Sequence, residues 1–428
     1  MNIPLDRLYH FIENIAEKIY GNRVIIYRFF PHGSKNIQDL NPTRTQTWLE
    51  DNIYPHIWCH DQEPLDHNYY QQNLRQFKKG GVNHILQKNY QKYLIKNLNY
   101  CKTIFSKGLL LHSEQRSANV ELYLRDEELI PVYYWSHAVI ARDWFRYAEH
   151  VEQQKKVAQL FLIYNRAWSN TREYRLKFAE LLIEPGLATQ CKISVNPIEP
   201  ELGIHYDSHN FKNPMWRPHT ILENVFQTSS AHSHFSADFD IEDYEATEIE
   251  VVLETLFDDN RLHLTEKSLR PIACGQPFIL AGTYGSLEYL RSYGFKTFGH
   301  IWDEQYDVEE DSYTRLNLIV DLMKQIANWA PEVRARKMAE AQAIADYNKQ
   351  HFFSQEFFDC VIAELKENLQ TAFDILKTLP ANQEWIEMAN IMLNSQELRA
   401  KVDRSRIHGF TMDNIKQALQ LVLPAQAI

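Results

Sequence analysis

Three consecutive residues, Thr265, Glu266 and Lys267, bring a hydroxyl, a carboxylate and an ammonium group to the start of an amphipathic segment. Thr265 has the side chain of a helix N-cap, which accepts a hydrogen bond from a backbone amide of the first turn. The Glu266 carboxylate suits the hydroxyls of a ribose or another sugar, and the Lys267 ammonium suits a phosphate. The same residues also fit a capped surface helix with an ordinary Glu–Lys pair, and spacing alone leaves both interpretations open.

The residues that follow predict the elements that position this triplet. Apolar side chains at helical spacing continue to Cys274, and Gly275 can adopt the left-handed conformation that ends many helices. An apolar run at 277–280 predicts a buried strand, a glycine-containing turn follows at 282–285, and 286–293 has the pattern of another helix. This order predicts part of a parallel α/β sheet, in which ligands bind at the carboxyl ends of strands, beside helix N-termini.

Carboxylates follow a second apolar strand, nearer the N-terminus. Residues 57–59 predict a short strand that ends at His60, Asp61 and Glu63. Asp61 or Glu63 can act as the general base that takes the proton of a hydroxyl acceptor, and His60 is expected to line the same cleft. One alternative is a turn whose acids bind its own backbone. A metal site that includes His67 is another interpretation, although no further ligand cluster accompanies it.

Two further clusters of polar residues lie beside apolar residues. His112 and Glu114 come directly after a run of leucines, so we expect them to reach the same cleft as Asp61. His137 and Arg142 lie in a helical segment that carries more polar residues than a core helix needs. For each of these four residues, a structural polar contact is the alternative to a place in an acceptor-binding cleft.

Arginines follow the strand predicted at 160–164. Arg166 and Arg172 lie between the end of that strand and the first turn of the next helix. Guanidinium groups at a helix N-terminus suit a diphosphate, because they donate forked hydrogen bonds to its oxygens. The alternative places Arg172 and Arg175 on a solvated helix face, paired with nearby glutamates.

The composition is that of a globular protein, and the length suggests about two domains. Of 428 residues, 44% are hydrophobic and 13% aromatic, and the formal net charge is −11. That charge argues against broad electrostatic binding to nucleic acid or anionic membranes. The N-terminal segment predicts neither a signal peptide nor an anchor, and no stretch approaches the ~20 apolar residues of a membrane span. Five scattered cysteines fit a reducing cytoplasm, where we expect the protein to be located.

Five sequence blocks carry a resemblance to known proteins. The Thr-Glu-Lys helix start, the small-residue helix end and the Pro-Phe-Ile strand resemble the donor-binding segment of α1,3-fucosyltransferase-type glycosyltransferases. Over most of residues 55–315, the chain is similar to uncharacterised glycosyltransferase-like proteins of phage and bacterial genomes. The blocks are HDQEPLD (60–66), YYWSHAVIARDWFRYAEH (133–150), YNRAWSNTREYRLKF (164–178), TEKSLRPIACGQPFIL (265–280) and GFKTFGHIWDEQYD (294–307).

The resemblance implies a fold. Glycosyltransferases of the GT-B type have two Rossmann-like α/β domains that face a central cleft, with the acceptor on the N-terminal domain and the nucleotide sugar on the C-terminal one. On this basis we expect an acceptor-side domain at 1–155, a donor-side domain at 156–350 and a helical C-terminal extension at 351–428.

The resemblance also implies an activity, the transfer of a sugar from a nucleotide-diphosphate sugar to a hydroxyl acceptor. Lys267, Arg166 and Arg172 would neutralise the leaving diphosphate, so that no metal cofactor is required. Glu266, beside the Thr265 cap, would hold donor hydroxyls. No acceptor-domain signature of fucosyltransferases is found, so the sugar is left open.

Two other functions are compatible with the same sequence. The phage-like resemblance raises glycosylation of a hydroxymethylated base in DNA, against which the acidic net charge weighs. A binding or scaffold protein that keeps the fold without turnover is the alternative from a different class. Such a scaffold would have no need for polar clusters at several successive strand ends.

Overall fold

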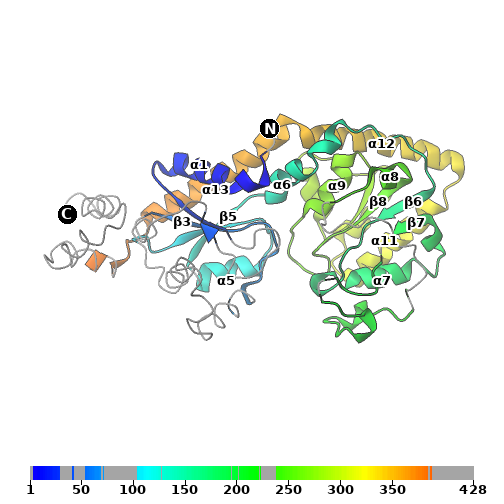
Figure 1. The fold of residues 1–428 in the computed structure, drawn as a ribbon, viewed down its shortest axis with the longest axis horizontal. Coiled ribbons are helices and arrows are strands. Elements are labelled where there is room, and N and C mark those ends of the chain that lie inside the picture. The colour runs from blue at the N-terminus through cyan, green and yellow to red at the C-terminus, as the bar shows by residue number, and fades with distance from the viewer. Residues whose placement is uncertain are drawn as a thin grey trace. The chain divides into compact units, whose positions relative to one another are not determined.

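The computed structural model divides the chain into two compact units, each described by itself (Figure 1). The N-unit contains Pro4–Ser136 and Ile362–Ile428, and the C-unit contains His137–Val361 with Met1–Ile3. The described residues are 3–28, 41–42, 54–68, 71, 104–126, 128–193, 195–200, 202–220, 222, 238–383 and 386–387.

The N-unit is built on a five-stranded sheet in the order β2-β1-β3-β4-β5, in which β2 is antiparallel to β1 and all other neighbours are parallel. Helices α1 and α13 lie on one face of this sheet, and α5 lies on the other (Figure 1). The bounds are α1 Leu8–Tyr20, β1 Ile25–Arg28, β2 Asn41–Pro42, β3 His56–His60, β4 Gly108–His112, α5 Ala118–Asp126, β5 Leu129–Tyr133 and α13 Gln355–Thr378.

Helix α13 returns the chain to the N-unit. The Phe373 ring lies 5.0 Å from that of Tyr20, at the end of α1, and the Asn368 amide donates to the Tyr133 carbonyl at 2.7 Å. The division between the units therefore falls within α13, after Val361, and again after Ser136. The boundaries expected from the sequence were 155 and 350. The observed boundaries differ from the expected ones because contacts such as the hydrogen bond between Asn368 and Tyr133 join residues that are 235 positions apart.

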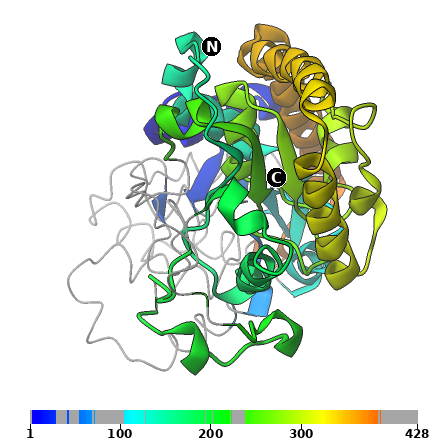
Figure 2. The ribbon, with the colours of Figure 1, turned by 90° about the vertical axis from the view of Figure 1, so that its right-hand side faces the viewer.

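The C-unit contains a fully parallel sheet of four strands in the order β7-β6-β8-β9. Helices α8, α9 and α12 cover one face, and α7 and α11 cover the other (Figures 1 and 2). The bounds are α6 Ser136–Trp144, β6 Gln159–Ile163, α7 Tyr174–Leu181, β7 Cys191–Ile193, α8 Ile241–Glu245, β8 Thr247–Leu253, α9 Glu266–Cys274, β9 Phe278–Ala281, α10 Ser286–Ser292, α11 Ser312–Ala327 and α12 Pro331–Phe353.

The strand order of the C-unit contains a topological switch point. From β6 the chain moves to one neighbour, β7, and then crosses back to β8 on the other side of β6. The connections that leave β6 and β8 therefore diverge at the carboxyl ends of these two strands. In open α/β sheets this is where ligands bind. In the N-unit, the mutually parallel strands β1, β3, β4 and β5 follow one another in chain order, so among these four strands there is no such reversal.

The local elements around the Thr-Glu-Lys triplet are confirmed. Thr265 is the N-cap of α9, and Gly275 ends the helix with φ 70° in the left-handed region. Strand β9 and helix α10 follow within a residue or two of the expected bounds. The expected α/β class is likewise confirmed, with a fully parallel sheet in the C-unit and a mainly parallel one in the N-unit.

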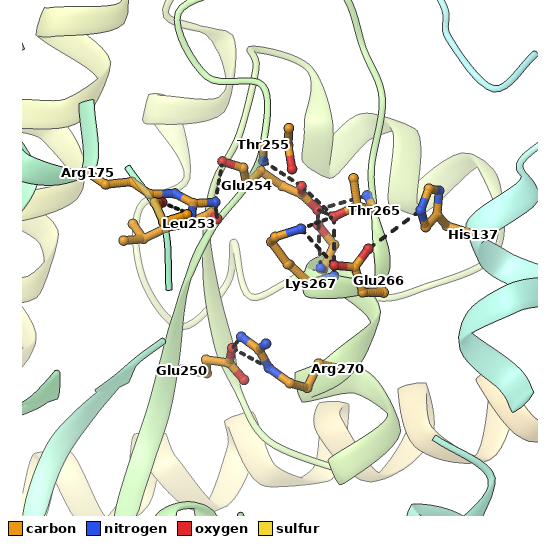
Figure 3. A network of polar contacts seen from close by, with 12 residues as sticks. His137, Arg175, Glu250, Leu253, Glu254, Thr255, Thr265, Glu266, Lys267 and Arg270 are labelled. Carbon is orange, nitrogen blue, oxygen red and sulfur yellow. Dashed lines mark hydrogen bonds and ion pairs between the residues drawn. The ribbon is translucent and has the colours of Figure 1, made fainter. Parts of the chain in front are cut away.

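A charged pair is buried in the core of the C-unit, between β8 and α9. The Arg270 Nη2 and Glu250 Oε1 atoms are 2.5 Å apart, and the two side chains are 4% and 0% exposed (Figure 3). The Tyr244 hydroxyl donates to the other carboxylate oxygen, and the Arg270 guanidinium lies 4.5 Å from the centre of the Tyr164 ring. The two charges of this pair thus compensate each other, and the pair joins α9 to β8.

We expect Arg270→Ala to lower the free energy of unfolding of the C-unit by about 3–5 kcal/mol, because it leaves the Glu250 carboxylate buried and unpaired. Arg334→Ala is the matched control, since Arg334 is 38% exposed and lies 3.8 Å from Glu248. The Arg334→Ala substitution should lower the free energy of unfolding by less than about 1 kcal/mol. Urea unfolding followed by tryptophan fluorescence measures both, and equal losses would contradict the assigned role of the buried pair.

Candidate functional site

Glu254, directly after β8, organises the start of α9. Its fully buried carboxylate accepts hydrogen bonds from the Thr265 amide at 2.9 Å, the Thr265 hydroxyl at 2.8 Å and the Ser268 hydroxyl at 2.6 Å (Figure 3). The Ser268 amide also donates to it, at 3.3 Å. An internal carboxylate therefore takes the position at a helix N-terminus where an anion is most stable.

The Thr-Glu-Lys triplet forms one connected group on this support. Thr265 Oγ1 accepts from the Lys267 amide, and the Lys267 ammonium donates to Thr265 Oγ1 at 3.2 Å and to Glu266 Oε1 at 2.7 Å (Figure 3). The Glu266 and Lys267 side chains are 6% and 13% exposed. The structure thus has the cap and the pair that the sequence indicated, in a largely buried setting rather than on an open surface.

His137 joins this group from α6, and both residues of the contact belong to the C-unit. Its Nε2 lies 3.5 Å from Glu266 Oε2 (Figure 3). Its ring meets that of His263 edge to face, with the ring centres 5.2 Å apart. The pKa of His137 is lowered to about 4, chiefly by burial; Glu266 opposes this shift and Lys267 adds to it. The imidazole is therefore neutral at pH 7, beside the residues expected to hold the donor.

Arg175, on α7, lies at the switch point. The sequence patterns did not predict it as a site residue. Its guanidinium donates to the Ala167 carbonyl after β6 at 2.6 Å, and to the Leu253 and Glu254 carbonyls at the end of β8 at 2.5 and 3.1 Å (Figure 3). One buried cation thus connects the two strand ends. No carboxylate forms an ion pair with it within the described residues.

The two arginines predicted for the diphosphate lie on the same β6–α7 connection. Arg166 is exposed, and Arg172 is half-buried with its Nε 3.3 Å from the Ser169 carbonyl. The glutamates of the alternative interpretation have other partners: Glu173 accepts from the Lys212 amide, and Glu180 pairs with Lys177. Arg175 therefore does not lie on a solvated face, because it is turned inward onto main-chain carbonyls.

Asp61 is a fully buried carboxylate in the N-unit. Tyr9, from α1, donates to one oxygen at 2.8 Å, and Tyr134, just after β5, donates to the other. Burial raises the pKa of Asp61, against the opposing effect of these two hydroxyls. Both oxygens are thus engaged by side chains that are distant in sequence, whereas the alternative from the sequence was a turn whose acids bind its own backbone. Glu63 is half-buried.

The other polar residues of the N-unit lie along the carboxyl ends of β3 and β4. His60 and His112 are register partners in the β3–β4 ladder. Glu114 accepts from the Leu65 amide at 2.5 Å and from the Ser117 hydroxyl, so it joins the loops that follow the two strands. These residues therefore lie close to one another, as expected. Within the described ranges, no group of three or more His, Cys, Asp or Glu side chains is arranged to hold a metal ion.

The Arg142 side chain forms a structural contact inside the C-unit. Its guanidinium donates to the carbonyls of Phe352, Phe353 and Ser354, the latter two at 3.0 Å. These carbonyls belong to the last turn of α12, which has no further helical amides to bind. Arg142 therefore closes the C-terminus of α12, the structural role that the sequence left as an alternative.

Comparison with known proteins finds no match: no family model, no curated protein and no solved structure is significantly similar to this chain. Among the described residues, no helix combines the length and the apolar composition that a membrane crossing requires. The functional assignment therefore depends on the geometry of the site.

The depressed pKa of His137 makes stability depend on pH. An unfolded histidine titrates near 6.5, whereas His137 stays neutral in the fold down to about 4, so its contribution is present above pH 6.5 and is lost as the pH falls through 4. Relative to His137→Gln, the wild type should lose about 3 kcal/mol of unfolding free energy between pH 7 and pH 4.

Urea unfolding at a series of pH values measures this difference. His150→Gln is the control, because the His150 side chain is 86% exposed, and its curve should run parallel to that of the wild type. Parallel curves for the wild type and His137→Gln would contradict a neutral, buried His137.

Proposed function

We propose that the protein is a glycosyltransferase of the GT-B type, which moves a sugar from a nucleotide-diphosphate sugar to a hydroxyl acceptor without a metal ion. The observation that carries this proposal is the position of Arg175 at the switch point of the C-unit sheet. Within the described part of the chain, this buried guanidinium binds main-chain carbonyls and the Tyr174 side chain and forms no ion pair with a carboxylate, so its positive charge stays available to an anion.

Cationic side chains supply the charge that a leaving diphosphate requires. Arg172 lies close enough to lower the pKa of Arg175, after the larger effect of burial, so two guanidinium groups share this edge of the sheet. Lys267 stands at the start of α9, which follows β8, and Arg166 is exposed on the connection after β6. Fixed cations aimed at a developing negative charge stabilise the transition state as a metal ion would.

The start of α9 favours side-chain contacts over backbone contacts to the donor. The Ser268 amide is taken by Glu254 and the Lys267 amide by Thr265, so the helix amides that usually bind phosphate are already occupied. In our proposal Lys267 therefore meets the phosphate through its ammonium group. Glu266, held by Lys267 and close to His137, accepts hydrogen bonds from hydroxyls of the donor.

The base that takes the proton of the acceptor is proposed to be Glu63. Asp61 has the same chemistry, but its two oxygens are engaged by Tyr9 and Tyr134 and it is fully buried. Glu63 is half-buried two residues further along the same connection. A base of this kind must come within hydrogen-bond reach of the hydroxyl it activates.

We expect one nucleotide sugar in a panel to raise the melting temperature of the wild type and to have no such effect on Lys267→Ala. Binding at a hundredfold excess over the dissociation constant stabilises a fold by about 2.7 kcal/mol. Lys324→Ala is the matched control, because Lys324 also pairs with a carboxylate but is 41% exposed on α11. The shift should be the same with a chelator and with added Mg²⁺.

Turnover separates an enzyme from a binding protein with the same fold. The stabilising donor should release its nucleoside diphosphate in the presence of a hydroxyl acceptor, and Lys267→Ala should slow this on the order of 10²-fold. If no nucleotide stabilises the wild type, the transferase proposal fails. Stabilisation without turnover across a broad acceptor panel would favour the scaffold alternative.

A further inference from the structure

Several buried polar atoms without partners gather around the loop at 165–169, which follows β6. Both polar atoms of the Asn165 carboxamide lack a hydrogen-bond partner among the residues that the structure describes, although this side chain is almost completely buried. The same is true of Arg175 Nε and Glu199 Oε1. Arg175 and Glu199 hold this loop: Arg175 donates to the Ala167 carbonyl, and Glu199 Oε2 accepts from the Trp168 and Ser169 amides.

Unpartnered groups of this kind are costly. A buried donor or acceptor that has given up water without gaining a partner destabilises a fold, so proteins keep few of them. Here they coincide with the switch point, because Asn165 is the second residue after β6 and Arg175 connects the ends of β6 and β8. Ligands bind at this position in open α/β sheets.

The hydrogen-bonding chemistry of these unpartnered atoms restricts the class of ligand that can bind to them. Asn165 offers a donor and an acceptor side by side, Arg175 Nε is a donor, and Glu199 Oε1 is an acceptor. A phosphate would use only the donors, and a metal ion only the acceptors. A flat heterocycle with alternating donors and acceptors on its edge uses both, and a carboxamide pairs with such an edge through two hydrogen bonds.

We infer that the loop after β6 recognises the nucleobase of the donor, with the Asn165 carboxamide reading its hydrogen-bonding edge. This inference rests on the proposed function and extends it from the diphosphate to the base. Arg166 and Arg172, on the same connection, flank Asn165 in sequence and suit the diphosphate next to that base. Sugar hydroxyls, the other ligand of mixed polarity, are assigned to Glu266 at the start of α9.

The test is titration calorimetry of the full chain with adenosine, guanosine, uridine and cytidine diphosphates and with pyrophosphate. The wild type should prefer one base. Asn165→Ala should bind that diphosphate about tenfold to a hundredfold more weakly and lose the preference, with pyrophosphate affinity unchanged. The melting temperature of unliganded Asn165→Ala should be equal to or above that of the wild type, because the substitution removes an unpaired buried amide.

Further variants separate recognition from folding. Asn165→Asp, which exchanges the donor for an acceptor, should change which base is preferred. Asn317→Ala, at a half-buried asparagine of α11, should leave every affinity unchanged. Retained base preference in both Asn165 variants would overturn the inference while the transferase proposal stands. If the wild type binds no nucleoside diphosphate, the proposed function itself fails, and the two failures are thus distinguishable.

Discussion

The carboxylate of Glu254 is the interaction on which the C-unit site depends. It sits at the end of β8, where it accepts hydrogen bonds from the amide and hydroxyl groups of both Thr265 and Ser268. Hydrogen bonds to an ionised acceptor are stronger than neutral ones, and the positive end of the helix dipole adds to them. One buried charge thus fixes the distance and the angle between β8 and the first turn of α9. Glu266 and Lys267 take their positions from that turn.

The buried arginines of the C-unit fall into two kinds. Arg270 is neutralised by Glu250 and stabilises the core. The others donate to main-chain carbonyls, which for Arg142 lie at the end of α12. Arg175 and Arg315 donate to carbonyls near strand ends, such as those of Ala167 and Gly282. Because carbonyls solvate a cation without cancelling its charge, positive potential remains at this edge of a chain whose formal net charge is −11. An acidic protein can therefore present a local binding site for an anionic ligand.

Local patterns in the sequence predicted the elements that position the site. Helix α9 with its Thr265 cap and Gly275 end, and the strand after it, follow from side-chain chemistry within a few residues. What the sequence did not predict depends on residues that are far apart in the chain. Asp61 has the chemistry of a base, but its burial is set by Tyr9 and Tyr134, which are 52 and 73 positions away.

Arg175 shows the same limit for the binding site. From sequence it fits an exposed helix face with glutamates nearby, because nothing local indicates that α7 turns this residue toward the end of β8, 78 positions away. Two weaker signals were present: Glu254 stands exactly where a strand ends, and Asn165 stands where another ends. A strand-end polar residue followed by a helix is thus a more useful indicator of the site than a charge pair on the helix.

Hydrogen–deuterium exchange, with and without saturating nucleotide sugar, tests most directly whether the switch point of the C-unit binds the donor. We expect slower exchange at 165–172 and 254–268, in the two connections that leave β6 and β8, and unchanged exchange in α11. Protection confined to other segments, or no protection at millimolar concentrations of any nucleotide sugar, would contradict this expectation.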